Sequence, residues 1–152
     1  MNTSKFDCLI LPSQDLILQL EEGFKPCSPR SWSRDIKKLY KNTCVVTGLP
    51  QFECELASHH LFSKKQNPHL QYSLLNGLPL AKQVHKAFHK NCGMHTCPIQ
   101  LKKFLEINIR YLKNSEGINN FYPEINDLDR LEKLVDWIIF LETEMSRIYT
   151  LS

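Results

Sequence analysis

The sequence predicts an α+β domain in which a short β-hairpin is flanked by helices. Two short segments rich in β-forming or apolar residues, at 44–48 and 55–62, precede an extended stretch at 77–80. Three later segments place apolar residues three or four positions apart, as amphipathic helices do. A chain of 152 residues is long enough for one domain with its own hydrophobic core.

The first element expected along the chain is a short helix within residues 31–42. Ser33 is the candidate for its N-cap, and Ile36, Leu39 and Tyr40 follow at helical spacing. The outer side of this helix would carry four basic residues: Arg34, Lys37, Lys38 and Lys41.

Strands are expected next. The run CVVTG at 44–48 is β-rich and ends in Thr-Gly, and ELASHHLF at 55–62 is typical of a strand. The Asn-Gly dipeptide at 76–77 predicts a turn. Residues 77–80 are predicted to be extended, since Pro79 disfavours helix at the residue before it.

Three helices are expected in the second half of the chain. The first spans about ten residues of AKQVHKAFHKN at 81–91. The second starts near Thr96 or Cys97, with Pro98 in the first turn, where its missing N–H is harmless. Its apolar stripe is Leu101, Phe104, Leu105, Ile109 and Leu112.

The last helix is expected to begin after Asn126 or Asp127. Its apolar stripe is Leu131, Val135, Ile138, Leu141, Met145 and Ile148. Such a stripe is more often core packing than a dimer interface, so a homodimer through this C-terminal amphipathic helix is the lesser expectation.

Charge is distributed unevenly along the chain. Residues 25–113 hold fifteen Lys and Arg against four acidic residues, a net charge of +11, whereas 1–24 carry −3 and 114–152 carry −5. A block this basic is the electrostatic signature of a polyanion partner, and nucleic acid is the favoured one. The alternative, lysines that only solubilise the surface, fits poorly because mixed charges are usual there.

Composition excludes some locations. No apolar run approaches the length of about eighteen residues that a membrane span needs. Asp7 and Asp15 interrupt the apolar start of the chain, which does not resemble a secretory signal. We therefore expect an intracellular protein with no membrane partner.

Its six cysteines are expected to be reduced thiols: Cys8, Cys27, Cys44, Cys54, Cys92 and Cys97. A structural zinc site that uses the pairs at 44/54 and 92/97 stays open.

The histidines are the candidate functional residues of this sequence. His59 and His60 are neighbours in an expected strand, so their side chains point to opposite faces and have different tasks. His85 and His89 are one helical turn apart and share one face, which is how a helix offers two nitrogens to one metal ion.

Four motifs occur in a characteristic order: CVVTG at 44–48, SHHL at 58–61, NGLPL at 76–80 and HKAFH at 85–89. In order and spacing the chain resembles the HNH family of nucleases over roughly residues 30 to 110. The resemblance implies a ββα-metal core with flanking helices. It also implies a division into an N-terminal extension (1–30), the nuclease domain (31–113) and an acidic helical C-terminal extension packed on it (114–152).

Carried over position by position, the resemblance implies a role for each residue of the motifs. His59, His85 and His89 would bind one divalent metal ion. His60 would be the general base that takes a proton from water, and Asn76 would stabilise the loop and orient that base. A neutral imidazole can do this near physiological pH.

Two departures from the family pattern bear on this interpretation. Many members have Asp where His59 stands, so the metal, Mg²⁺, Mn²⁺ or Zn²⁺, stays open. Many also carry C-x-x-C zinc pairs, which this chain lacks. The hairpin would then be held by apolar packing of Val45, Val46, Leu56, Leu61, Val84 and Phe88.

The resemblance therefore implies a DNA endonuclease, closest to small homing or free-standing enzymes. The basic residues expected to contact DNA phosphates are Arg34, Lys64, Lys65, Lys82, Lys86 and Lys90. The alternatives are a restriction endonuclease, a non-catalytic metal-stabilised module that binds nucleic acid, and a toxin nuclease, for which the chain is short.

Overall fold

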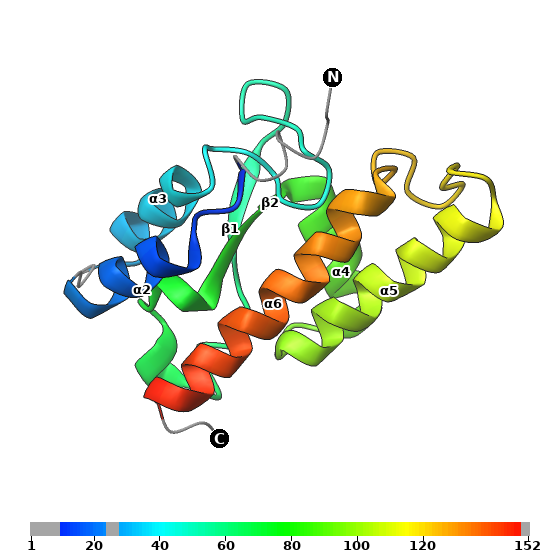
Figure 1. The fold of residues 1–152 in the computed structure, drawn as a ribbon. Coiled ribbons are helices and arrows are strands. Elements are labelled where there is room, and N and C mark those ends of the chain that lie inside the picture. The colour runs from blue at the N-terminus through cyan, green and yellow to red at the C-terminus, as the bar shows by residue number, and fades with distance from the viewer. Residues whose placement is uncertain (1–9, 24–27, 150–152) are drawn as a thin grey trace.

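The computed structural model describes residues 10–23 and 28–149. Within these ranges the chain forms five α-helices and one two-stranded antiparallel sheet, so the predicted α+β class is confirmed (Figure 1). The helices are α2 (Gln14–Gly23), α3 (Pro29–Leu39), α4 (Lys82–Cys92), α5 (Pro98–Asn114) and the long α6 (Leu128–Ile148). The strands are β1 (Leu56–His60) and β2 (Gly77–Ala81), and the 3₁₀ helices between them are η1 (Pro68–Leu70) and η2 (Leu74–Asn76).

The hairpin forms where the sequence predicts it. Strand β1 pairs with β2 in a register that sets Leu56 opposite Ala81 and His60 opposite Gly77. Helices α3 and α4 both contact both strands, and every residue of β2 is buried. The six apolar residues expected to hold the hairpin are all buried, so this prediction is also confirmed.

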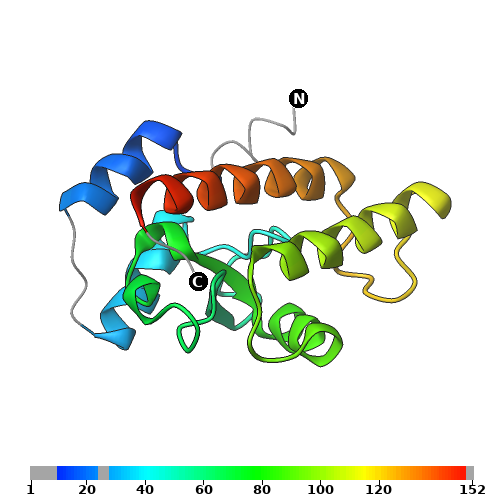
Figure 2. The ribbon, with the colours of Figure 1, turned by 90° about the horizontal axis from the view of Figure 1, so that it is seen from below.

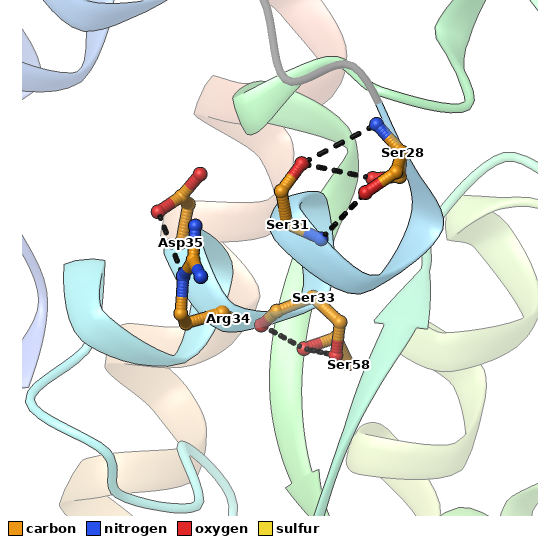
Figure 3. Close-up of polar contacts among 6 residues, drawn as sticks. All are labelled: Ser28, Ser31, Ser33, Arg34, Asp35 and Ser58. Atoms are coloured by element: carbon orange, nitrogen blue, oxygen red, sulfur yellow. Dashed lines mark hydrogen bonds and ion pairs between the residues drawn. The ribbon is translucent and has the colours of Figure 1, made fainter.

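Helix α3 begins earlier than the sequence predicts. Its N-cap is Ser28, whose Oγ accepts a hydrogen bond from the Ser31 backbone N–H at 3.1 Å, and Pro29 occupies the first helical position (Figure 3). The assignment of Ser33 as N-cap is wrong. Ser33 lies inside the helix, where its Oγ donates to Ser58 Oγ at 3.1 Å and its carbonyl oxygen accepts from the Ser58 hydroxyl at 2.8 Å. These bonds attach α3 to β1.

The predicted strand at 44–48 is wrong. This segment makes a tight turn in which the Gly48 N–H donates to the Cys44 carbonyl at 2.8 Å, flanked by a single bridge between Thr43 and Pro50. Gly48 has a φ of 77°, and a Cβ there would lie 2.6 Å from the Arg130 guanidinium. The side chains of Val45 and Val46 are buried in the core without entering a ladder.

The later helices begin where their cap signals predict. Cys97 is the N-cap of α5 with Pro98 next, and Asp127 is the N-cap of α6, its carboxylate accepting from the Arg130 N–H at 3.1 Å. Helix α6 runs alongside α5 and above the hairpin (Figure 2). Its Trp137 Nε1 donates to the buried Tyr40 hydroxyl at 2.9 Å. Most of its apolar stripe packs within this chain, and a homodimer stays a prediction.

No element was predicted for the segment that forms helix α2. Its Glu21 carboxylate is buried and accepts hydrogen bonds from the Ser73 hydroxyl at 2.8 Å and the Leu74 N–H at 2.7 Å. The Tyr149 hydroxyl, at the end of α6, donates to the same carboxylate. One buried carboxylate thus joins both ends of the described chain to the loop that precedes β2.

Two further observations concern composition. Among the residues with described positions, no helix has the length and apolarity that a membrane span requires. Cys44, Cys54, Cys92 and Cys97 are free thiols, whereas Cys8 and Cys27 lie outside the described residues.

Candidate metal centre

Three histidines converge between the hairpin and helix α4. His59 Nδ1 lies 3.3 Å from His85 Nε2, and His85 Nε2 lies 2.9 Å from His89 Nε2. One nitrogen from each ring lies within 4.8 Å of the others, so the group can hold a metal ion. His59 is on the buried side of β1 facing α4, where the other two rings stand one turn apart.

The donor set fits a metal ion that prefers nitrogen ligands. Nitrogen atoms about 2.0–2.1 Å from a tetrahedral zinc ion lie about 3.3 Å from one another, close to the two separations seen here. His89 Nδ1 must donate its hydrogen to the Gly93 carbonyl, 2.7 Å away, because a carbonyl only accepts. This hydrogen bond leaves Nε2, the nitrogen beside His85, as the ring atom that can bind a metal ion.

Burial keeps His59 and His85 in the form that binds metals. Desolvation, followed by the neighbouring imidazoles, lowers the pKa of His59 well below 6.5 and the pKa of His85 to about 4. Both rings are therefore neutral at pH 7, as metal coordination requires. His59 Nε2 is buried and has no hydrogen-bond partner within residues 10–23 and 28–149, and its ring meets the Phe88 ring edge-on at 5.1 Å.

His60 occupies a different environment from His59, as strand alternation predicts. Its ring is stacked on Trp32, with centroids 4.0 Å apart and planes 9° apart. Its Nε2 lies 3.0 Å from the Gln71 carbonyl, so Nε2 carries the hydrogen and Nδ1 carries the lone pair. Burial lowers the pKa of His60, the Gln71 hydrogen bond raises it and Lys64 lowers it, so the ring is neutral at pH 7.

Asn76 holds the loop that joins the two strands. The side chain is fully buried; its Oδ1 accepts from the Phe62 N–H at 2.7 Å, and its Nδ2 donates to the carbonyls of Phe62 and Leu70, each at 3.1 Å. Leu70 directly precedes Gln71, whose carbonyl fixes the His60 ring. Asn76 therefore positions the backbone that orients His60, and it does not line the site itself.

The triad and His60 open onto one cavity of about 320 Å³. The residues that line it are Ser58, His59, His60, Ser63, Lys64, Lys65, His85, His89, Met94, His95 and Thr96. Among the residues whose positions are described, no Asp or Glu lines this cavity. Its lining is therefore suited to an anion.

The other predicted phosphate contacts lie outside the cavity. Lys82 pairs with Glu55 at 3.3 Å, and Lys86 and Lys90 are exposed on α4 without lining the cavity. Arg34 is exposed on α3 and lies 3.9 Å from Asp35 (Figure 3). Of the six basic residues predicted to contact DNA, only Lys64 and Lys65 share the cavity with the histidines.

Part of this cavity was not predicted from the sequence. Met94, His95 and Thr96 belong to the loop between α4 and α5, and neither periodicity nor the family pattern marks them. Their proximity depends on the Ser63 N–H, which donates to the Thr96 carbonyl at 3.0 Å. The only sequence signal was His95 itself, a further histidine six residues after His89.

Comparison of this chain with models of known protein families, with curated proteins and with solved structures finds no match.

Proposed function

We propose that this protein is a metal-dependent DNA endonuclease with the ββα-metal arrangement of the HNH nucleases. The observation that carries the proposal is the position of His60. Its nitrogen lone pair is on Nδ1, and His60 is one of the residues that line the same cavity as three histidines that can hold a metal ion. A purely structural metal site has no need of a further oriented imidazole.

The chemistry follows from the residues of the cavity. His60 Nδ1 accepts a proton from a water molecule, and the oxygen of that water forms the new bond to phosphorus. The bond from phosphorus to the 3′ oxygen breaks, and the 3′ oxygen takes a proton from solvent. The products are a 5′-phosphate and a 3′-hydroxyl. A metal ion bound by the triad would polarise the phosphate and stabilise charge on the leaving oxygen.

The type of ligand argues for a particular class of metal. Three imidazoles are borderline-soft donors, which suit Zn²⁺ and Ni²⁺ better than Mg²⁺, since Mg²⁺ prefers oxygen ligands. We propose one such ion as the cofactor.

The acid-free cavity and the basic block argue for DNA as the substrate. Lys64 and Lys65 place two positive charges at the cavity, where they would contact phosphates and position the strand. Phosphate contacts carry no sequence information, so this surface favours no recognition sequence.

Plasmid cleavage tests the proposal. Purified protein is incubated with supercoiled plasmid and with Zn²⁺, Mn²⁺, Ni²⁺ or Mg²⁺, and the ends of any product are analysed. We expect cleavage with the transition metals, and loss of cleavage by two or more orders of magnitude in His60→Ala with metal binding retained. His69→Ala is the matched control, since His69 is an exposed histidine outside the cavity.

The possible results distinguish a nuclease from a non-catalytic module and test the role of His60. Metal binding by the wild type without cleavage in any metal would favour a non-catalytic module that binds nucleic acid. Cleavage by His60→Ala at the rate of the wild type would remove His60 from the role of base.

A further inference from the structure

The cavity has two walls of different origin. One wall consists of the triad and His60, on β1 and α4. The other comes from two loops, Ser63–Lys65 after β1 and Met94–Thr96 after α4, joined by the hydrogen bond from the Ser63 N–H to the Thr96 carbonyl at 3.0 Å. A group bound in the cavity is therefore bordered by residues of both walls.

His95 is presented by a loop that is held at both ends. On one side Gly93 is bound to His89 twice, its N–H donating to the His89 carbonyl at 2.8 Å and its own carbonyl accepting from His89 Nδ1 at 2.7 Å. On the other side Thr96 is buried and Cys97 caps α5. Between these anchors His95 is exposed and lines the cavity.

His95 is not one of the metal-binding group, which consists of His59, His85 and His89. An imidazole carries at least one N–H in either protonation state, so it can donate a hydrogen bond to an anion throughout the physiological pH range. The cavity is lined by no carboxylate of the described chain that would compete for this donor.

We propose that His95 contacts the substrate, donating a hydrogen bond to a non-bridging oxygen of the phosphate bound in the cavity. The inference rests on the proposed function, since it assigns the phosphate of a nucleic acid as the group that enters. It adds a substrate-contacting residue from the second wall to the two lysines there. His95 acts on the phosphate and does not hold the metal.

Kinetics and metal binding test this role together. His95→Ala should lower kcat/KM on DNA roughly 10- to 100-fold, as expected for loss of a hydrogen bond to a charged group. His95→Gln, which keeps an N–H donor, should recover part of the loss, and zinc affinity should equal that of the wild type in both variants. His69→Ala should change neither quantity. Unchanged kinetics in His95→Ala, or a loss of zinc affinity, would overturn the proposal.

A binding experiment tests the proposed contact between His95 and the phosphate without relying on DNA cleavage. Wild-type protein is titrated with thymidine 3′,5′-bisphosphate, which contains no diester bond, and the histidine Cε1–H signals are followed by NMR. The His95 signal, assigned from the spectrum of His95→Gln, should move during the titration while the His69 signal stays in place. A static His95 signal would overturn the proposal even if the protein cuts DNA. A shift at His95 in a protein that cuts no DNA would refute only the proposed nuclease activity.

Discussion

Replacing Asn76 by alanine should destabilise the protein more than any exposed polar substitution. The side chain is fully buried and makes three hydrogen bonds to the backbone of the loop between β1 and β2. Each such bond contributes about 1 kcal/mol net, and a buried donor left without a partner costs about 1–3 kcal/mol more. In this variant the Phe62 N–H would be a buried donor without a partner, because it donates to Asn76 Oδ1 in the wild type.

The expected loss in the free energy of unfolding is therefore about 4–6 kcal/mol. This is a large part of the roughly 5–15 kcal/mol that stabilises a typical domain, and it corresponds to a fall in Tm of roughly 10 °C for a chain of this size. The measurement is urea denaturation, with thermal unfolding as a second probe. The matched control is Asn91→Ala, since Asn91 is exposed on α4 and bonds to the Ala87 carbonyl and the Tyr122 hydroxyl.

A loss below about 1 kcal/mol in Asn76→Ala, or one equal to that of Asn91→Ala, would refute the reasoning, because a typical net hydrogen bond already contributes that much. The loop would then hold its shape without the amide. The position of Gln71, and with it the orientation of His60, would need another explanation.

Glu21→Ala should lower the free energy of unfolding by about 3 kcal/mol in urea denaturation, because a buried carboxylate that accepts several hydrogen bonds is lost. Burial and then Glu21 raise the pKa of Tyr149 from 10.0 to about 12. Since the unfolded chain ionises first, this stability is full below pH 10 and is lost as the pH rises from 10 to 12. Tyr149→Phe should therefore lose less stability than the wild type over that window. His85→Ala should reduce the rise in Tm that zinc produces, because only the folded state holds the complete triad. Replacing Lys64 and Lys65 together by alanine should reduce the slope of log affinity for DNA against log salt by about two units.

Each of these predictions has a result that would contradict it. Glu22→Ala, an exposed neighbour, is the control for Glu21, and equal losses would remove the carboxylate from its structural role. Parallel pH profiles for the wild type and Tyr149→Phe would mean that its hydroxyl titrates normally. An equal zinc-induced shift in His85→Ala would exclude that residue from the metal site. An unchanged salt slope would mean that the DNA path lies elsewhere, such as along Arg34 on α3.

The sequence by itself determined the local features. Strands β1 and β2 and helices α4, α5 and α6 were predicted because period, proline position and cap residues act over a few neighbouring residues. The spacing of His85 and His89 has the same local origin, and so does the separation of His59 from His60 onto different faces. The role of each histidine in catalysis stays a prediction.

Tertiary structure decided what depends on contacts between distant segments. Ser33, the expected N-cap of α3, lies inside the helix, whose Trp32 and Ile36 are buried. Val45 and Val46 favour β structure, yet their side chains are buried in a turn, because burial rather than propensity settles β structure.

The candidate metal site also combines features set by local sequence with features set by tertiary contacts. The i, i+4 spacing places two rings side by side, but the third joins them only because the register of the hairpin sets β1 against α4. The bond from His60 to Gln71 depends on the path of a loop, and the place of His95 depends on one backbone hydrogen bond from Ser63 to Thr96. Such contacts join residues many positions apart and leave no periodic trace in the sequence, so only the folded chain reveals them.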